Sequence, residues 1–188
     1  MPVTAIDPKS ALIVIDLQKG IAGMFPGSEA LSTVVENTNR LALAFRKKGL
    51  PVVLVVVAGT APGRTDGPAR GHKELPAGFT DLVPELSHEP TDILIVKKTP
   101  GAFANTGLKQ QLNDLGVTQV VITGVSTSNG VDSTARQAYE LGYNVTLPTD
   151  AMTDGNLESH TASITKVFPR IAETGTTDDV LSFLAPGS

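Results

Sequence analysis

Three positions in this 188-residue chain place chemistry-bearing groups at the end of a strand-like run. Asp16 follows the apolar run ALIVI, Lys97 ends the run ILIVK, and the segment GVSTSNGVDS begins at Gly124 after the run VVIT. In open parallel α/β sheets, ligands bind beyond the carboxyl ends of the strands. A carboxylate and an ammonium that meet there with little water form a pair suited to holding a proton beside a substrate.

Each of these side chains also has a simpler explanation. Asp16 can cap the turn after its strand, and Lys97 can extend its charged end to solvent. Lys98 is predicted to point to the opposite face of the strand, so only one of the two lysines can join the cluster. Gln18 and Phe25 follow Asp16 and are candidates for lining a pocket, although packing or turn formation explains them equally well.

The elements that must position these residues alternate between strand-like and helical patterns. Several of the strand-like runs are apolar on both faces, which is typical of a parallel sheet covered by helices on both sides. The predicted strands are residues 11–16, 52–58, 93–98, 120–123, 144–148 and 171–174. The first predicted helix begins near Ser28. Further helices are predicted over residues 106–115, 130–141 and 157–168, and a last one in TTDDVLSFL.

Two of the helices carry more detailed expectations. The helix over residues 130–141 has a predicted apolar side made of Val131, Ala135, Ala138, Tyr139 and Leu141. For the last helix, Thr177 or Asp178 is the expected N-cap residue.

Composition excludes several classes of protein. The chain has 15 basic and 19 acidic residues, with no basic cluster or aromatic stripe, so we expect neither a nucleic-acid partner nor binding to a membrane. Its apolar runs are strand-sized, and 40% of its residues are hydrophobic, which predicts a single globular domain over residues 1–188. Because the chain has no cysteine, disulfides and a Cys nucleophile are excluded. No export signal is evident, so the expected location is cytoplasmic.

Other catalytic motifs are weak or missing. GVSTSNG differs from the nucleophile elbow G-x-S-x-G, because Ser128 occupies the position of the second glycine, and no histidine is evidently placed as a base for Ser126. The histidines are far apart, so no metal site is predicted, with Asp66 and His72 as the weak exception. The chain contains neither the dinucleotide-binding motif G-x-G-x-x-G nor the nucleotide-triphosphate-binding motif G-x-x-x-x-G-K-[ST]. No cofactor is expected.

Three segments, taken in order, resemble the isochorismatase-like hydrolase superfamily. They are IVIDLQKG, VKKTPGAFANTGL and VVITGVSTSNGVDSTARQAYELGYNVTLPTDAMTD, and the match runs from about Ser10 to Thr177. The resemblance implies a three-layer α/β/α fold with a mostly parallel six-stranded sheet. It also implies a small-molecule substrate and a homo-oligomer, either a dimer or a tetramer.

The resemblance implies roles for particular residues. The family's Asp falls on Asp16, its Lys on Lys97, and its usual nucleophilic Cys on Gly130. Amide-cleaving members attack a carbonyl through that Cys, so their usual chemistry is not expected here. The isochorismatases proper also place Gly there, and in them the Asp acts as a general acid on a vinyl ether and pyruvate is released. Lys97 would then bind a carboxylate or order Asp16.

The same comparison assigns candidate substrate contacts. Gly130 is expected to leave space for substrate, with backbone N–H groups nearby that attract its anionic end. Asn129 can orient water or substrate, and Ser126 stands in the same stretch. The family also tends to have a cis peptide, which would lie between Val125 and Ser126. Where authentic isochorismatases carry aromatic, Arg and His side chains, this chain has Lys98, Thr99, Ser126 and Thr127, so the substrate is left open.

The Gly- and Pro-rich stretch from Gly59 to Gly78 is long enough to cover a site. Its Arg64, Arg70, His72 and Lys73 could close over a dicarboxylate substrate, although solvated loop charges are the commoner outcome.

The preferred interpretation is a cysteine-independent hydrolase of a small organic acid, with Asp16 as general acid or base and Lys97 as its partner. One alternative is a catalytically silent member that binds a small ligand or acts as an oligomer. The other is an amidase in which Asp16 activates water directly.

Overall fold

The computed structural model describes residues 3–25, 27–66 and 74–185. Within them the strands form one sheet in which every strand pair is parallel, in the order β3-β2-β1-β4-β5-β7, with the short β6 pairing with β4. The strands are β1 (Ser10–Ile15), β2 (Val52–Val57), β3 (Ile93–Lys97), β4 (Gln119–Val125), β5 (Asn144–Pro148), β6 (Met152–Thr153) and β7 (Glu173–Gly175). The predicted parallel sheet is confirmed, with β6 as an addition that the sequence pattern did not indicate.

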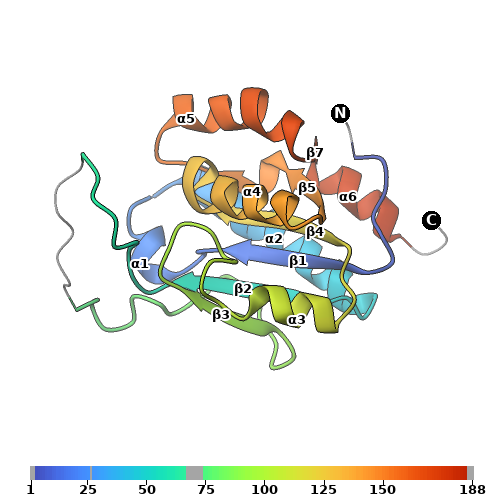
Figure 1. The fold of residues 1–188 in the computed structure, drawn as a ribbon, viewed down its shortest axis with the longest axis horizontal. Coiled ribbons are helices and arrows are strands. Elements are labelled where there is room, and N and C mark those ends of the chain that lie inside the picture. The colour runs from blue at the N-terminus through green and yellow to red at the C-terminus, as the bar shows by residue number, and fades with distance from the viewer. Residues whose placement is uncertain (1–2, 26, 67–73, 186–188) are drawn as a thin grey trace.

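Helices cover both faces of the sheet and complete a three-layer α/β/α fold (Figure 1). In the view of Figure 1, α3 and α4 lie in front of the sheet and α2 lies behind it. The helices are α1 (Lys19–Ala22), α2 (Glu29–Lys47), α3 (Leu108–Asp114), α4 (Asp132–Glu140), α5 (Leu157–Ala162) and α6 (Thr177–Leu184). None of the helices within the described ranges combines the length and apolar character that crossing a membrane requires.

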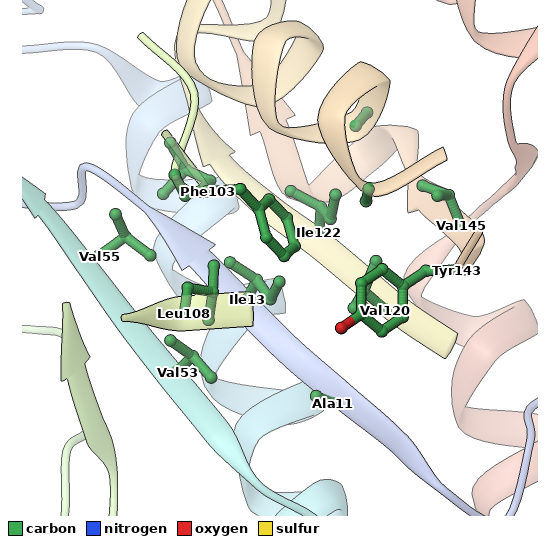
Figure 2. Packing of buried hydrophobic residues seen from close by; sticks show 14 of the residues in the cluster. Ala11, Ile13, Val53, Val55, Phe103, Leu108, Val120, Ile122, Tyr143 and Val145 are labelled. Atoms are coloured by element: carbon green, nitrogen blue, oxygen red, sulfur yellow. The ribbon is translucent and has the colours of Figure 1, made fainter. Parts of the chain in front are cut away.

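Alternating side chains of the central strands build one core on each face. Ile13 of β1 and Ile122 of β4 point toward α3 and α4, where Phe103 and Leu108 pack over them (Figure 2). Leu12, with the other even-numbered residues of β1, points toward α2 and α6. Because β1 is fully buried on both faces, its end is held in a fixed place.

The order of the strands puts a topological switch point between β1 and β4. From β1 the chain adds β2 and β3 on one side, and then returns to add β4, β5 and β7 on the other. Ile15 at the end of β1 lies opposite Gly124 of β4. The segments that leave these two strands therefore diverge from one place, where α/β proteins bind ligands.

Two details of the helices differ from the sequence expectations. On α4, Tyr139 is 53% exposed and Leu141 is 38% exposed, so neither belongs to the buried side. The buried stripe is Val131, Ala135 and Ala138, whose spacing of four and three residues already forms one narrow face. The predicted helix over residues 157–168 ends earlier as a regular α-helix, because the chain continues from residue 163 as a π-helical turn and a 3₁₀ turn.

The N-cap of α6 is Thr176, and the expectation of Thr177 or Asp178 is wrong. The Thr176 hydroxyl accepts a hydrogen bond from the Asp179 N–H, and the Asp179 carboxylate accepts one from the Thr176 N–H. This reciprocal pair is a capping box with Asp in the place where Glu or Gln is usual. The cap predicted for α2 is confirmed, since Ser28 Oγ accepts from the Leu31 N–H at 3.2 Å.

Candidate active site

Asp16 leaves the end of β1 in an unusual backbone conformation. Its N–H still donates to the carbonyl of Val55 at 2.9 Å, which continues the ladder between β1 and β2. Its φ is +54°, in the left-handed region that non-glycine residues adopt rarely and that Asp and Asn tolerate better than most. The chain therefore turns sharply at Asp16, and the residue is only 6% exposed.

Lys97 reaches Asp16 across the end of an intervening strand. It ends β3, and β2 lies between β3 and β1. Its Nζ lies 2.9 Å from Asp16 Oδ2 and donates to the carbonyl of Pro100 at 2.5 Å. Because Lys97 is 1% exposed, its ammonium is used in ordering Asp16 and the loop, rather than presented to solvent. Lys98 is exposed on the other face, as predicted from the strand alternation.

The Asp16 carboxyl is poised between its two protonation states. Burial raises the pKa of this carboxyl to about 6, and the attraction of the Lys97 charge acts in the opposite direction without cancelling it. Its Oδ1 is buried and has no hydrogen-bond partner among the described residues. One oxygen is thus held by a cation, while the other is available to a ligand, a water molecule or a proton.

The backbone at Gly130 lies close to the Asp16–Lys97 pair. A Cβ on Gly130 would lie 2.9 Å from Ile15 Cγ2, 3.1 Å from Asp16 Oδ2 and 3.2 Å from Lys97 Nζ. The missing side chain therefore leaves little open room at the Cβ position itself, because these three side-chain atoms lie close around it. A residue with a Cβ would require these side chains to shift slightly, so glycine eases the close approach of the chain to the two charged groups.

The segment around Gly130 forms a π-helical turn over Thr127–Val131, directly before α4. The peptide bond between Val125 and Ser126, just ahead of this turn, is cis. Ser126 is half-buried, Asn129 is exposed, and Gly130 is buried. A Cβ on Gly130 would meet atoms of both Asp16 and Lys97, so the structure brings Asp16, Lys97 and Gly130 together. Ser126 directly precedes the same turn, and Asn129 lies within it.

The β6–α5 segment holds the start of the turn. Asp154 accepts from the N–H and the hydroxyl of Ser128 at 2.8 and 2.7 Å, and His160 Nδ1 lies 2.8 Å from the hydroxyl of Thr127. Burial acts to raise the pKa of Asp154, but the hydrogen bonds from Ser128 and Asn156 outweigh it and lower that pKa. His160 contacts Thr127 and not Ser126, which gives no support to a serine nucleophile.

Gln18, Phe25 and Arg64 are the other predicted substrate contacts among the described residues. Gln18 is fully buried, and its side-chain amide bonds the N–H and carbonyl of Val57 and the carbonyl of Phe79. Its side chain therefore holds the loop to β2 and reaches no surface that a substrate could contact. Phe25 is half-buried and packs with the α2-side core, while Arg64 is exposed.

Three further loop residues, Arg70, His72 and Lys73, lie outside the described residues. Among the described residues, no group of three or more His, Asp or Glu side chains is arranged to hold a metal ion.

Three groups that contact Lys97 or the turn were not among the site residues predicted from the sequence. The carbonyl of Pro100 accepts a hydrogen bond from Lys97, and a main-chain acceptor of this kind cannot be predicted from residue type. Asp154 and His160 bind the turn from α5 and its preceding loop. A signal for Asp154 was present, because an Asp two residues before a helix N-cap such as Asn156 is well placed to bind backbone N–H groups.

Comparison with known proteins identifies the family. The Isochorismatase domain model matches residues 10–179. The chain is 38% identical over 183 residues to the uncharacterized isochorismatase family protein YecD of Escherichia coli O157:H7, covering 93% of this chain and 96% of that protein. It is 33% identical over 168 residues to a probable inactive nicotinamidase of Arabidopsis thaliana, covering 82% and 86% of the two chains.

A solved structure agrees with these matches. An isochorismatase family protein from Burkholderia thailandensis superposes with a TM-score of 0.88 at 36% identity, covering 96% of this chain and 97% of that one. Sequence, fold and domain model thus give the same answer, and the chain belongs to the isochorismatase family of hydrolases.

Proposed function

We propose that this protein is a cysteine-independent hydrolase of a small organic acid, with Asp16 as the general acid and base and Lys97 as its electrostatic partner. The proposed reaction is the hydrolysis of an enolpyruvyl vinyl ether. Asp16 donates its proton to the terminal methylene carbon, which becomes a methyl group. Water adds to the resulting oxocarbenium carbon and returns one proton to Asp16. The hemiketal hydroxyl then loses its proton, the ether oxygen gains one, and the bond between the central carbon and the ether oxygen breaks, giving pyruvate and an alcohol.

The observation that carries the proposal is the state of the Asp16 carboxyl. Its pKa of about 6 leaves about a tenth of the molecules protonated at neutral pH, whereas an ordinary Asp would be almost wholly ionised. A general acid works best when its pKa is close to the working pH. Oδ1, which has no partner among the described residues, is the oxygen from which the proton would be donated.

Lys97 and Gly130 support the same role. The ammonium of Lys97 stabilises the Asp16 carboxylate that remains after proton donation, at 2.9 Å and away from solvent. Gly130 offers no side chain for nucleophilic attack, so a covalent intermediate at this position is not part of the proposal. Water is the nucleophile, and the positive charge developing on the substrate faces the Asp16 carboxylate.

The test is pyruvate release from isochorismate, followed with lactate dehydrogenase and NADH. The unmodified protein, Asp16→Asn and the control Lys98→Gln are compared, since Lys98 is an exposed lysine next to Lys97. We expect release by the unmodified protein and the control, loss in Asp16→Asn, and a rate that falls as pH rises above about 6. No release by the folded unmodified protein would withdraw the named substrate.

A second candidate is a silent member of the family that binds a small acid without converting it. The similarity to a probable inactive nicotinamidase, together with Gly130 at the nucleophile position, favours this alternative. Calorimetric binding of isochorismate without any pyruvate release would support it. Ammonia release from small amides, lost in Asp16→Asn, would instead favour the amidase in which Asp16 activates water.

A further inference from the structure

The loop after β3 is held against α4 by a buried hydroxyl. This loop contains Gly101, Ala102 and Phe103, and we call it the GAF loop. The hydroxyl of Thr134 on α4 accepts a hydrogen bond from the Ala102 N–H at 3.1 Å and donates one to the carbonyl of Gly130 at 2.7 Å. Thr134 is fully buried, so both bonds are shielded from water. One side chain therefore joins the GAF loop to the turn that carries Gly130.

A second side chain on the same face of α4 holds the next residue of the loop. Gln137 follows Thr134 by three residues, and its Oε1 accepts from the Phe103 N–H at 3.0 Å. The amide comes so close to the loop that a Cβ on Gly101 would lie 2.3 Å from Oε1. Glycine at position 101 is thus required for this contact. The Phe103 ring stacks on Tyr143 at a centroid distance of 5.8 Å, and Figure 2 shows both rings over the sheet.

This clamp is connected directly to the charged pair. Pro100, immediately before Gly101, provides the carbonyl that accepts from Lys97 Nζ. Lys97 has a long and flexible side chain, and it must cross the end of β2 to reach Asp16. The Pro100 carbonyl holds the ammonium together with Asp16, and the two bonds from α4 hold the loop residues that follow Pro100.

We propose that Thr134 and Gln137 are positioning residues that fix the GAF loop and thereby the Asp16–Lys97 pair. Neither residue touches Asp16 or Lys97, and each acts through the backbone of the loop. The significance of the clamp for turnover rests on the proposed function, but its effect on the pair can be measured without any substrate. Loosening the loop would admit water beside Asp16 and reduce the burial that raises the pKa of its carboxyl.

The experiment is a titration of the Asp16 carboxyl by carbon-13 NMR in the whole protein. Thr134→Val keeps the shape of the side chain and removes both hydrogen bonds, while Thr134→Ser keeps the hydroxyl. Entry of water lowers the Asp16 pKa, whereas outward movement of Lys97 raises it. Because burial is the largest of these causes, we expect a net fall from about 6 by at least about half a unit in Thr134→Val. In Thr134→Ser it should return to the value of the unmodified protein.

Thr165→Val is the matched control. The Thr165 hydroxyl makes the same type of bond, to the carbonyl of Thr161 at 2.7 Å, on an exposed part of the chain. This variant should leave the Asp16 pKa unchanged. If Thr134→Val does not fold, Gln137→Met keeps a similar side-chain length, removes only the acceptor for Phe103, and should lower the pKa in the same direction.

An Asp16 pKa identical to that of the unmodified protein in the folded Thr134→Val and Gln137→Met variants would overturn the proposal. Because the titration uses no substrate, a failure of pyruvate release by the unmodified protein leaves this result unaffected. If turnover is found, the pH at which the rate begins to fall should move down in Thr134→Val together with the pKa.

Discussion

Among the described residues, two pairs of opposite charge are largely buried, and their contacts differ. Arg46 of α2 binds Asp92 through two parallel contacts, from Nε to Oδ1 at 3.1 Å and from Nη2 to Oδ2 at 2.7 Å. The same arginine donates to Ser87, and Asp92 also accepts from the Glu89 N–H. Both side chains are nearly buried, at 11% and 4% exposure, and both carboxylate oxygens of Asp92 are satisfied.

The Asp16–Lys97 pair is buried to a similar degree, with side-chain exposures of 9% and 1%, yet its hydrogen bonding is less complete. Lys97 contacts only one oxygen of Asp16, and Oδ1 has no partner among the described residues. A buried polar atom without a partner costs roughly 1–3 kcal/mol, so a pair kept only for stability would be expected to resemble Arg46–Asp92. The first pair fastens the segment before β3 to α2, whereas the second leaves one carboxylate oxygen open, as the proposed function requires.

The largest expected difference between the pairs is in activity. Asp16→Asn removes the proton that the proposed reaction needs and should lower pyruvate release by at least about a hundredfold. Asp92→Asn, in the other pair, should leave the rate per folded molecule within about twofold, because Asp92 has no part in the proposed chemistry. Steady-state assays of both variants at pH 6 give the comparison. Equal losses would remove the distinction between the two pairs.

The next largest effect is on stability. Arg46→Met leaves the Asp92 carboxylate nearly buried without its cation, and should lower the free energy of unfolding by about 3–5 kcal/mol. Arg40→Met breaks the exposed pair with Asp178 and should cost at most about 1 kcal/mol. Urea unfolding at neutral pH measures both. A small cost for Arg46→Met would mean that water reaches Asp92 and that this pair is not structural.

A third prediction concerns the pH dependence of stability. The pKa of Asp16 is raised by burial from the ordinary 3.8 to about 6, so the unfolded chain loses this proton first as pH rises. Stability from this group is present in full below pH 3.8 and is lost as pH rises to about 6, with a total change of about 3 kcal/mol. Unfolding measured from pH 4 to 7 should show this loss in the unmodified protein. Asp16→Asn should not show this loss. If the unfolding free energies of the two proteins changed in parallel with pH, the raised pKa would be contradicted.

The smallest effect tests how closely Gly130 approaches the pair. Gly130→Ala places a Cβ within 2.9–3.2 Å of Ile15, Asp16 and Lys97, and the crowding should cost about 1–3 kcal/mol of unfolding free energy. Gly63→Ala is the control, since a Cβ there meets no atom within 4 Å, and it should stay within about 0.5 kcal/mol. Thermal or urea unfolding is sufficient for both. A neutral Gly130→Ala would mean that the pair moves aside without cost.

Much of the fold followed from local patterns in the sequence. Runs such as those in β1 and β2 are apolar on both faces, and this happens only in a sheet covered twice, so the parallel sheet and its strand-end residues could be predicted. The convergence of Asp16 and Lys97 followed from the same rule, because both leave the carboxyl ends of parallel strands.

The remaining details depend on contacts between distant segments. A glutamine at position 18 is compatible both with lining a pocket and with bonding the backbone of Val57. Which of the two occurs depends on the loop that folds over its side chain. The space beside Gly130 depends on how far Ile15 and Lys97 reach into it. The clamp on the GAF loop was also out of reach, since Ala102 and Thr134 are 32 residues apart and meet only when α4 is in place.

The left-handed backbone at Asp16 has a consequence for the evolution of this position. A φ of +54° restricts the residue to the few types that tolerate it, mainly Gly, Asn and Asp, whatever the chemistry of the site. A descendant without the proposed catalytic role would thus still retain Asp or drift to Asn or Gly, and not to Ala, Val or Glu. An Asp at this position can therefore be retained either for its backbone conformation or for activity. The backbone of Lys97 imposes no such restriction, so retention of Lys97 is the better indicator of an active site.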